Sequence, residues 1–361
     1  MKNLFLFVCF YAVAAFVFSF PLKAAPPSQI QPETAAGLDQ SRPDRPSRDV
    51  PQTSTEYAIN SLLRTEKTTA GAPDAKDIQA PSTAPAGSDN EDGFSAPAAY
   101  SEYKFAQIQD NRSIGFDGPQ HNGIVGFDFE SYWNTIVGFN FTYTNESLTT
   151  NLAPTNFFNS SNSYFFSTYA AKNFSDWVNV GGSFTYGRTD TDWRADFTGA
   201  GSFALGQKTT QDSFALSPFI GVAHTWGAFS FSSTPTYIWD YDHYSYDLPT
   251  FNGSVAPGTP SLPDNKTLNQ TFLWLNNFQY AVTDKWTFSI QANWTRLLTI
   301  QSVPTTITPF IPPLGHQWMS FGGRVDYAFN KDGDVFVQFE HDAFNTHFDD
   351  YRIRTGVSYN F

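Results

Sequence analysis

The last eleven residues of the chain alternate between apolar and polar side chains. The apolar side is formed by Tyr351, Ile353, Val357, Tyr359 and Phe361. The polar side is formed by Arg352, Arg354, Ser358 and Asn360. A repeat of two residues indicates a β-strand, because side chains along a strand point alternately to its two faces. One face with only apolar or small residues and one face with arginines suit a wall between lipid and a polar lumen.

The composition fits membrane strands better than membrane helices. The mean hydropathy of -0.34 is too low for a helical membrane protein. Strands expose only every second residue to lipid, so 40% hydrophobic residues with 17% aromatics suit them. The net charge of -13 argues against nucleic acid as a partner, since nucleic-acid binding requires a basic surface. The single cysteine, Cys9, lies in an N-terminal apolar run, so we expect no thiol or disulfide chemistry after processing.

The N-terminus has the three parts of a secretory signal peptide. A positively charged N-terminal region with Lys2 precedes an apolar core from Leu4 to Phe20. A cleavage region with small residues follows from Leu22 to Ala25. We therefore predict a signal peptide over residues 1–25 and export of the mature chain. A transmembrane anchor is the alternative interpretation.

Residues 26–99 are rich in Pro, Ser, Thr, Ala, Asp and Gln and have few residues that support a core, which predicts a disordered segment. Within it, Ser54–Lys67 has the pattern of one short helix that brings Ile59, Leu62 and Leu63 together. Isolated helices of this length are marginal in water, so a transient helix in a tail is one interpretation. A plug or a partner-binding helix is the other.

After Tyr100 the chain consists of alternating segments separated by turn signals. Eleven segments stand out: Gly123–Phe129, Thr135–Tyr143, Ser163–Ala171, Trp177–Tyr186, Ser213–His224, Phe229–Tyr241, Leu268–Ala281, Trp286–Leu298, Met319–Phe329, Asp334–Glu340 and Tyr351–Phe361. Both termini of an outer-membrane barrel lie in the periplasm, which requires an even number of strands. A weaker segment at Ala99–Ile108 supplies the twelfth. We predict an all-β, antiparallel transmembrane β-barrel of about twelve strands over residues 100–361, with ten as the alternative.

The connections alternate between short and long, as in barrels with tight periplasmic turns and large surface loops. The predicted short connections are Glu130–Asn134, Lys172–Asp176, Thr225–Gly227, Thr283–Lys285 and Asn330–Gly333. The predicted long ones are Asn145–Asn162, Thr189–Gln211, Tyr244–Thr267, Ile300–Leu314 and His341–Asp350. Tryptophan, which collects at the edges of the hydrocarbon layer, predicts two girdles. Trp133, Trp177, Trp226 and Trp286 mark the short turns, and Trp239 and Trp318 the long loops.

Several stretches of the chain resemble known families. The closing strand resembles that of outer-membrane β-barrels, and this resemblance implies that Tyr359 and Phe361 form the signal read by the barrel-assembly machinery. The glycine-spaced strand, turn and strand from Asn122 to Thr144, the proline-bearing Ser217–Gly221 and the ending Ser358–Phe361 resemble the translocator domain of autotransporters. Such proteins carry a long β-helical passenger and a helix that enters the pore before the first strand, whereas the upstream segment is short here. The resemblance implies export or display of the N-terminal segment.

Two further interpretations stay open for the function. One is a small porin-like channel or a surface-loop adhesin with a periplasmic tail. The other, an omptin-like rim protease, follows from acidic and histidine residues near two long loops, namely Asp240, Asp242, His243, His341, Asp342, His347, Asp349 and Asp350. Solvated loop charges, or oxygens that hold calcium or the divalent ions of lipopolysaccharide, explain the same residues. We therefore expect no enzyme and assign no catalytic, cofactor-binding or metal-binding residue.

The even spacing of Arg324, Glu340, Arg352 and Arg354 predicts that they line the lumen from three neighbouring strands. They either pair across strands for stability or determine which solutes pass. The expected location is the outer membrane of a Gram-negative bacterium, and the expected partners are its lipid, lipopolysaccharide and the assembly machinery.

Overall fold

A computed structural model describes residues 52, 54–56, 97–109, 117–131, 135–152, 155–175, 177–197, 202–255, 264–303, 317–344 and 350–361. Twelve strands in this part of the chain form one closed antiparallel barrel. They are β1 (Ala98–Gln109), β2 (Asp117–Ser131), β3 (Thr135–Leu152), β4 (Thr155–Asn173), β5 (Val178–Phe197), β6 (Phe203–Trp226), β7 (Phe229–Tyr246), β10 (Asn265–Ala281), β11 (Trp286–Val303), β12 (Gln317–Ala328), β13 (Gly333–Ala343) and β14 (Tyr351–Asn360). The predicted signal peptide lies outside these residues.

Barrel closure is made by the first and last strands. β1 pairs with β2 on one side and with β14 on the other, in a register that runs from Ala98 opposite Asn360 to Gln107 opposite Tyr351. The twelve-strand prediction is therefore confirmed, including the weak first strand, and the ten-strand alternative is wrong. Two short strands, β8 (Thr250–Phe251) and β9 (Ser254–Val255), form a hairpin beside β6. Within the described chain, no helix has the length and apolar character needed to cross a membrane.

Alternation along the strands produces an apolar outer wall. On β2, Val125 and Phe127 are 50% and 44% exposed, whereas Asp128 beside them is buried. Aromatic side chains of neighbouring strands touch across this outer face, as in the Phe127–Phe139 pair with ring centroids 5.7 Å apart. Such cross-strand pairs stabilise a sheet and fix its register. The outer wall thus has the chemistry of a lipid-facing surface.

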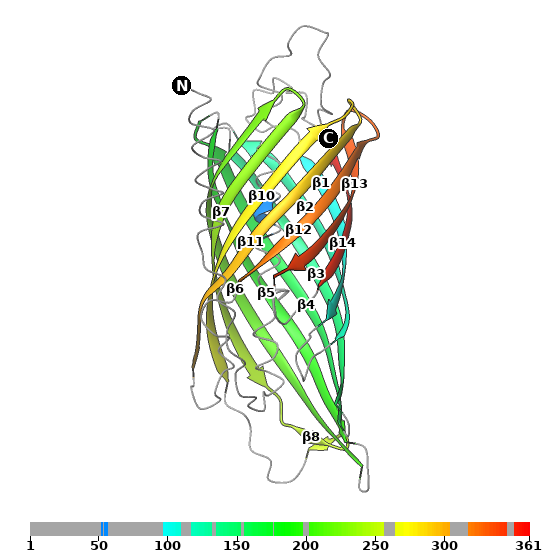
Figure 1. Ribbon diagram of the computed structural model, residues 1–361. Helices are drawn as coiled ribbons and strands as arrows, with labels where there is room; N and C mark the ends of the chain where they lie inside the picture. The colour runs from blue at the N-terminus through cyan, green and yellow to red at the C-terminus, as the bar shows by residue number, and fades with distance from the viewer. Residues whose placement is uncertain are drawn as a thin grey trace. The chain divides into compact units, whose positions relative to one another are not determined.

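The short turns, the start of β1 and the C-terminus share one rim (Figure 1). The amide of Asn360 donates to the carbonyl oxygen of Asp332 in a short turn, at 2.8 Å, and that of Phe361 donates to Pro97, at 3.1 Å. The Thr283 hydroxyl accepts from the amide of Trp286 at 3.1 Å and closes another turn. These turns lie where the sequence predicted them.

At the opposite rim, the predicted loops Asn145–Asn162 and Thr189–Gln211 are largely wrong. β3 continues to Leu152 and β4 begins at Thr155, so most of the first predicted loop is strand. β5 and β6 are 20 and 24 residues long, against 12, 11 and 10 for β12, β13 and β14. About ten residues are enough to cross a membrane as a strand. One side of the barrel therefore continues beyond the bilayer, towards β8 in Figure 1.

Tryptophan follows the predicted girdles in part. Trp177, Trp226 and Trp286 are exposed on the outer face at the short-turn rim, and Trp239 is exposed towards the other rim. Trp318 is the exception, since it is only 5% exposed and lies on the inner face. The reason is the alternation of β12, whose even-numbered positions point inwards. Trp133 lies outside the described residues.

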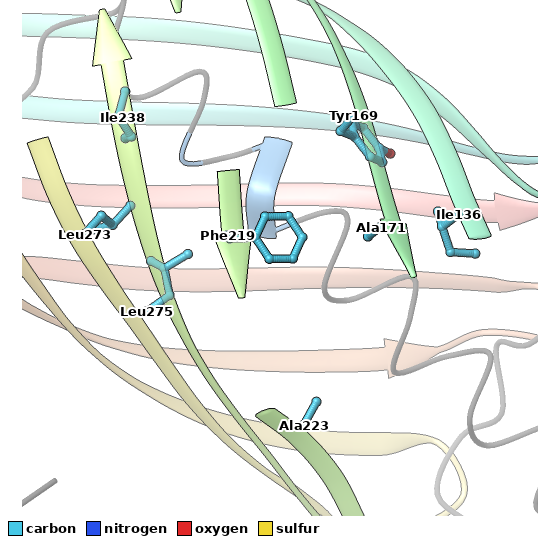
Figure 2. Packing of buried hydrophobic residues seen from close by; sticks show 8 residues of the cluster. All are labelled: Ile136, Tyr169, Ala171, Phe219, Ala223, Ile238, Leu273 and Leu275. Atoms are coloured by element: carbon cyan, nitrogen blue, oxygen red, sulfur yellow. The ribbon is translucent and has the colours of Figure 1, made fainter. Parts of the chain in front are cut away.

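The inner wall is not uniformly polar. Eight buried residues form an apolar cluster on β3, β4, β6, β7 and β10, namely Ile136, Tyr169, Ala171, Phe219, Ala223, Ile238, Leu273 and Leu275 (Figure 2). Aromatic rings lie directly over glycines of the neighbouring strand, Tyr169 over Gly138 and Tyr100 over Gly126. A side chain at either glycine would collide with the ring, so glycine is required there by close approach.

Candidate functional site: the barrel lumen

The four residues expected to line the lumen lie on the inner face of β12, β13 and β14. Arg352, Arg354 and Glu340 are each less than 7% exposed, and they alternate with exposed outer residues. The register places Arg324, Gln338, Arg354 and Lys104 in one row across β12, β13, β14 and β1. A row with three cationic side chains on the inner face requires nearby carboxylates.

Arg354 is the centre of an ion-pair cluster. Its guanidinium donates to Glu102 of β1 through Nε at 2.6 Å and through Nη2 at 3.1 Å. Nη1 donates to Glu340 of β13 at 3.2 Å. The same Nη1 also donates to Glu56, upstream of the barrel, at 2.9 Å. Fork-shaped pairs of this kind are the strongest charge-assisted hydrogen bonds that side chains make.

The other two arginines have their own partners. Arg352 pairs with Asp342, and its Nη1 lies 3.7 Å from Glu340. Arg324 donates to Asp326 on its own strand, at 2.9 Å from Nε and 2.6 Å from Nη2, and its guanidinium lies 3.6 Å from the centre of the Phe336 ring. The structure thus brings Glu340, Arg352 and Arg354 into one cluster, while Arg324 pairs beside it.

Glu102 and Glu56 were missed by the sequence analysis. The signal for Glu102 was present, because two arginines on the inner face of the last strand require carboxylates and the last strand of a barrel pairs with the first. Glu56 carried no such signal, since nothing in the sequence predicts that a distant segment meets β14.

The described residues upstream of the barrel, Gln52 and Ser54–Glu56, have helical conformation and contact the inner wall. Ser54 and Thr55 are completely buried. The Asn140 amide on β3 donates to the Ser54 hydroxyl at 3.1 Å, and Glu56 reaches Arg354 on β14. The segment is therefore held inside the barrel between strands on different parts of the wall. Of the predicted helix Ser54–Lys67, residues 57–67 lie outside the described chain.

The acidic and histidine residues near the long loops are divided between the two faces. Asp242 points inwards and accepts from Gln211 at 2.7 Å, Ser213 at 2.6 Å and Asn269 at 3.0 Å. His243, the next residue, lies on the outer face near Asp264. Neighbouring residues on a strand point to opposite faces, which separates them.

The second loop gives a similar division. Asp342 faces inwards to Arg352, whereas the His341 ring stacks on Tyr351 at the outer face, with centroids 4.5 Å apart. His347 and Asp349 lie outside the described residues. No group of three or more acidic, histidine or cysteine residues in the described chain could hold a metal ion.

An apolar outer wall, a rim of short turns that includes the C-terminus, and a polar, charged lumen within twelve closed strands define the fold of outer-membrane β-barrels. The sequence matches no protein-family model and no curated protein. The comparison with solved structures therefore defines the fold further.

The chain has the fold of autotransporter translocator domains. It is similar to the translocator domain of NalP from Neisseria meningitidis, with a TM-score of 0.60 and 14% identity over 75% of this chain and 90% of that one. The β domain of the Bordetella autotransporter BrkA gives 0.52 and 14%, over 74% and 100%. The transport unit of AIDA-I from Escherichia coli gives 0.50 and 11%, over 85% and 98%.

Proposed function

We propose that the protein is an outer-membrane barrel of a Gram-negative bacterium that carries its own N-terminal segment through the lumen and displays or exports it. The observation that carries this proposal is the position of Ser54 and Glu56, which contact the inner wall at Asn140 and Arg354. A barrel of eight strands is filled by its own side chains, and one of sixteen encloses an open channel. Twelve strands leave space for about one additional segment of chain.

The contacts to the segment suit a chain that is held but can be released. Arg354 keeps two other carboxylate partners when Glu56 leaves, and the Asn140 amide donates a hydrogen bond to the Ser54 hydroxyl. Loss of the segment therefore leaves no buried guanidinium without a carboxylate. A lumen with this property tolerates both an occupied and an empty state.

A second function, that of a small channel, is favoured by the uncharged part of the inner wall. Hydroxyl and amide side chains face inwards on β3, β4 and β5, including Thr142, Ser163, Ser167 and Thr185. Such a wall binds solutes weakly, which is what conduction requires. If the protein is a channel, the conductance of the full chain in a planar bilayer should equal that of a variant without residues 26–56.

An epitope inserted after Gln40 separates the two functions. If the segment is exported, antibody binds this epitope on intact cells to the same extent as a control epitope inserted between β9 and β10, among residues 256–263. If the segment stays in the periplasm, the loop epitope is bound on intact cells and the Gln40 epitope only after the outer membrane is permeabilised. The second result would reject export.

A further inference from the structure

The polarity of β5 reverses along its length. Up to Tyr186 its outer residues are apolar and exposed, as on Phe184, and its inner residues are small and polar. Beyond Tyr186 the outer positions are charged, and from Trp193 onwards the inner positions are apolar. The charged outer residues are Arg188, Asp190, Asp192, Arg194 and Asp196, and the apolar inner residues are Trp193, Ala195 and Phe197. Charges on the outer face mean that this part of the strand has left the lipid.

Aromatic residues of the neighbouring strands also lie on the inner face here and form an aromatic surface with those of β5. We call it the inner aromatic face and define it by Phe157 of β4, Trp193 and Phe197 of β5, Phe203 of β6 and Phe251 of β8. The ring centroids of Phe157 and Trp193 are 5.8 Å apart, those of Phe197 and Phe203 4.4 Å, and those of Phe203 and Phe251 5.3 Å. The rings therefore form two contacting groups, one across β4 and β5 and the other across β5, β6 and β8.

An aromatic sheet face outside the bilayer needs a layer of chain or ligand against it. The described strands of this region contact their sheet neighbours, and none of them is stacked across the inner aromatic face. The face also continues the inner wall of the barrel, because β3 to β6 run into it without interruption. Whatever leaves the lumen on this side passes over these rings.

The stretch Arg42–Pro51 of the same chain has matching chemistry. It reads Arg-Pro-Asp-Arg-Pro-Ser-Arg-Asp-Val-Pro, in which Pro43 and Pro46 have the spacing of a polyproline II ligand. Such helices dock on aromatic-lined grooves because their extended shape is already formed and little entropy is lost. Over residues 42–51 three arginines outweigh two aspartates. The inner wall near the aromatic face carries the carboxylate of Glu146, two residues before Leu148, which packs against Phe157.

The distance from Asn140 to the aromatic face is similar to the length of chain between Ser54 and Pro46. Asn140 holds Ser54, and the inner wall of β3 continues from there to Leu148 at the base of the aromatic face, eight residues or about 26 Å along the strand. From Gln52 back to Pro46 is six residues, which span about 19 Å in a polyproline II helix, and the two residues from Gln52 to the helical Ser54 add about 3 Å. A chain that leaves the lumen in this direction therefore brings Pro43 and Pro46 to the rings.

We propose that the inner aromatic face is the docking site for the proline-containing stretch Arg42–Pro51 after this stretch has passed through the barrel. The inference rests on the proposed export of the N-terminal segment. Its function is retention, since a docked stretch at the mouth of the barrel keeps the exported end at the cell surface.

Cysteine pairs test the proposal in the full chain, because a Cys9→Ser background contains no other thiol. The probe is Ser47→Cys, combined either with Thr191→Cys on the inner face of β5 or with Asp192→Cys on its outer face. We expect disulfide formation under mild oxidation to be about tenfold faster with Thr191→Cys than with Asp192→Cys. Adding Trp193→Ala, or Pro43→Ala with Pro46→Ala, should abolish this difference.

Labelling of Ser47→Cys on intact cells with an impermeant maleimide distinguishes the two possible failures. If the thiol is labelled but both pairs cross-link equally, or neither does, export stands and docking is overturned. If the thiol is labelled only in permeabilised cells, export itself fails. If a soluble oligosaccharide, but not a peptide of sequence 42–51, slows the Thr191→Cys cross-link, the face binds carbohydrate and the docking proposal is overturned.

Discussion

The ion pairs of Arg354 predict very different costs for two substitutions in the same cluster. Glu56→Gln removes one carboxylate from a guanidinium that keeps Glu102 at 2.6 Å and Glu340 at 3.2 Å. The glutamine oxygen still accepts a hydrogen bond, so we expect a loss of about 1 kcal/mol. Arg354→Met instead leaves Glu102 and Glu340 buried, with side chains 1% and 5% exposed. Removal of one partner from a buried ion pair costs about 3–5 kcal/mol.

Urea unfolding of the barrel in lipid bilayers, followed by tryptophan fluorescence and by the mobility of unheated protein on gels, measures these costs. We expect the midpoint for Arg354→Met to fall several times further than that for Glu56→Gln at an unchanged slope. A triple variant, Arg354→Met with Glu102→Gln and Glu340→Gln, is the control. It should recover much of the loss, because it neutralises the two buried carboxylates that lose Arg354 in the single variant.

Equal costs for Glu56→Gln and Arg354→Met would contradict this expectation, since Glu56 would then be as deeply integrated as the wall residues. The expectation would also be refuted if the triple variant were no more stable than Arg354→Met. That outcome would mean that the loss comes from side-chain volume and not from charge.

Three further predictions address the wall. Deletion of Phe361, whose side chain is 68% exposed at the short-turn rim, should reduce the yield of heat-modifiable barrel in outer membranes without reducing synthesis. Val337→Arg on the lipid face should lower the free energy of unfolding by about 2–4 kcal/mol if it lies near the midplane. Asp192→Arg, on the outer face of β5 beyond the bilayer, should lower it by almost nothing in the same urea titration. Gly138→Val should destabilise the barrel by collision with a tyrosine ring, whereas Gly123→Ala, where the new methyl group meets nothing within 4 Å, should be tolerated.

The sequence predicted the barrel well because the membrane imposes one pattern on every strand. Within the bilayer an outer residue must be apolar, so segments such as Thr135–Tyr143 are visible from alternation alone. The same logic failed outside the bilayer. On β5 the alternation continues past Tyr186 with its polarity reversed, and the charged positions Asp190 and Asp192 resemble a loop when only apolar outer residues are sought.

Of the residues in the lumen, only those that belong to the barrel wall could be predicted from the sequence. Even spacing was sufficient to assign Arg352 and Arg354 to the inner face, and pairing of the last strand with the first would have supplied Glu102. The contact of Glu56 with Arg354 joins residues 298 positions apart and depends on where an upstream segment enters the closed barrel. No local pattern encodes such a contact, although the short helix at Ser54 was visible as a hypothesis.

The most direct test of the central claim, that the upstream segment occupies the lumen, is a disulfide between Ser54→Cys and Asn140→Cys. The native atoms of these residues lie 3.1 Å apart on the inner face, whereas Phe141 beside Asn140 is 46% exposed on the outer face. In the Cys9→Ser background, the folded, heat-modifiable protein should form the Ser54–Asn140 disulfide rapidly and the control pair Ser54→Cys with Phe141→Cys hardly at all. A folded barrel in which neither pair forms, or both form equally, would contradict the occupied lumen.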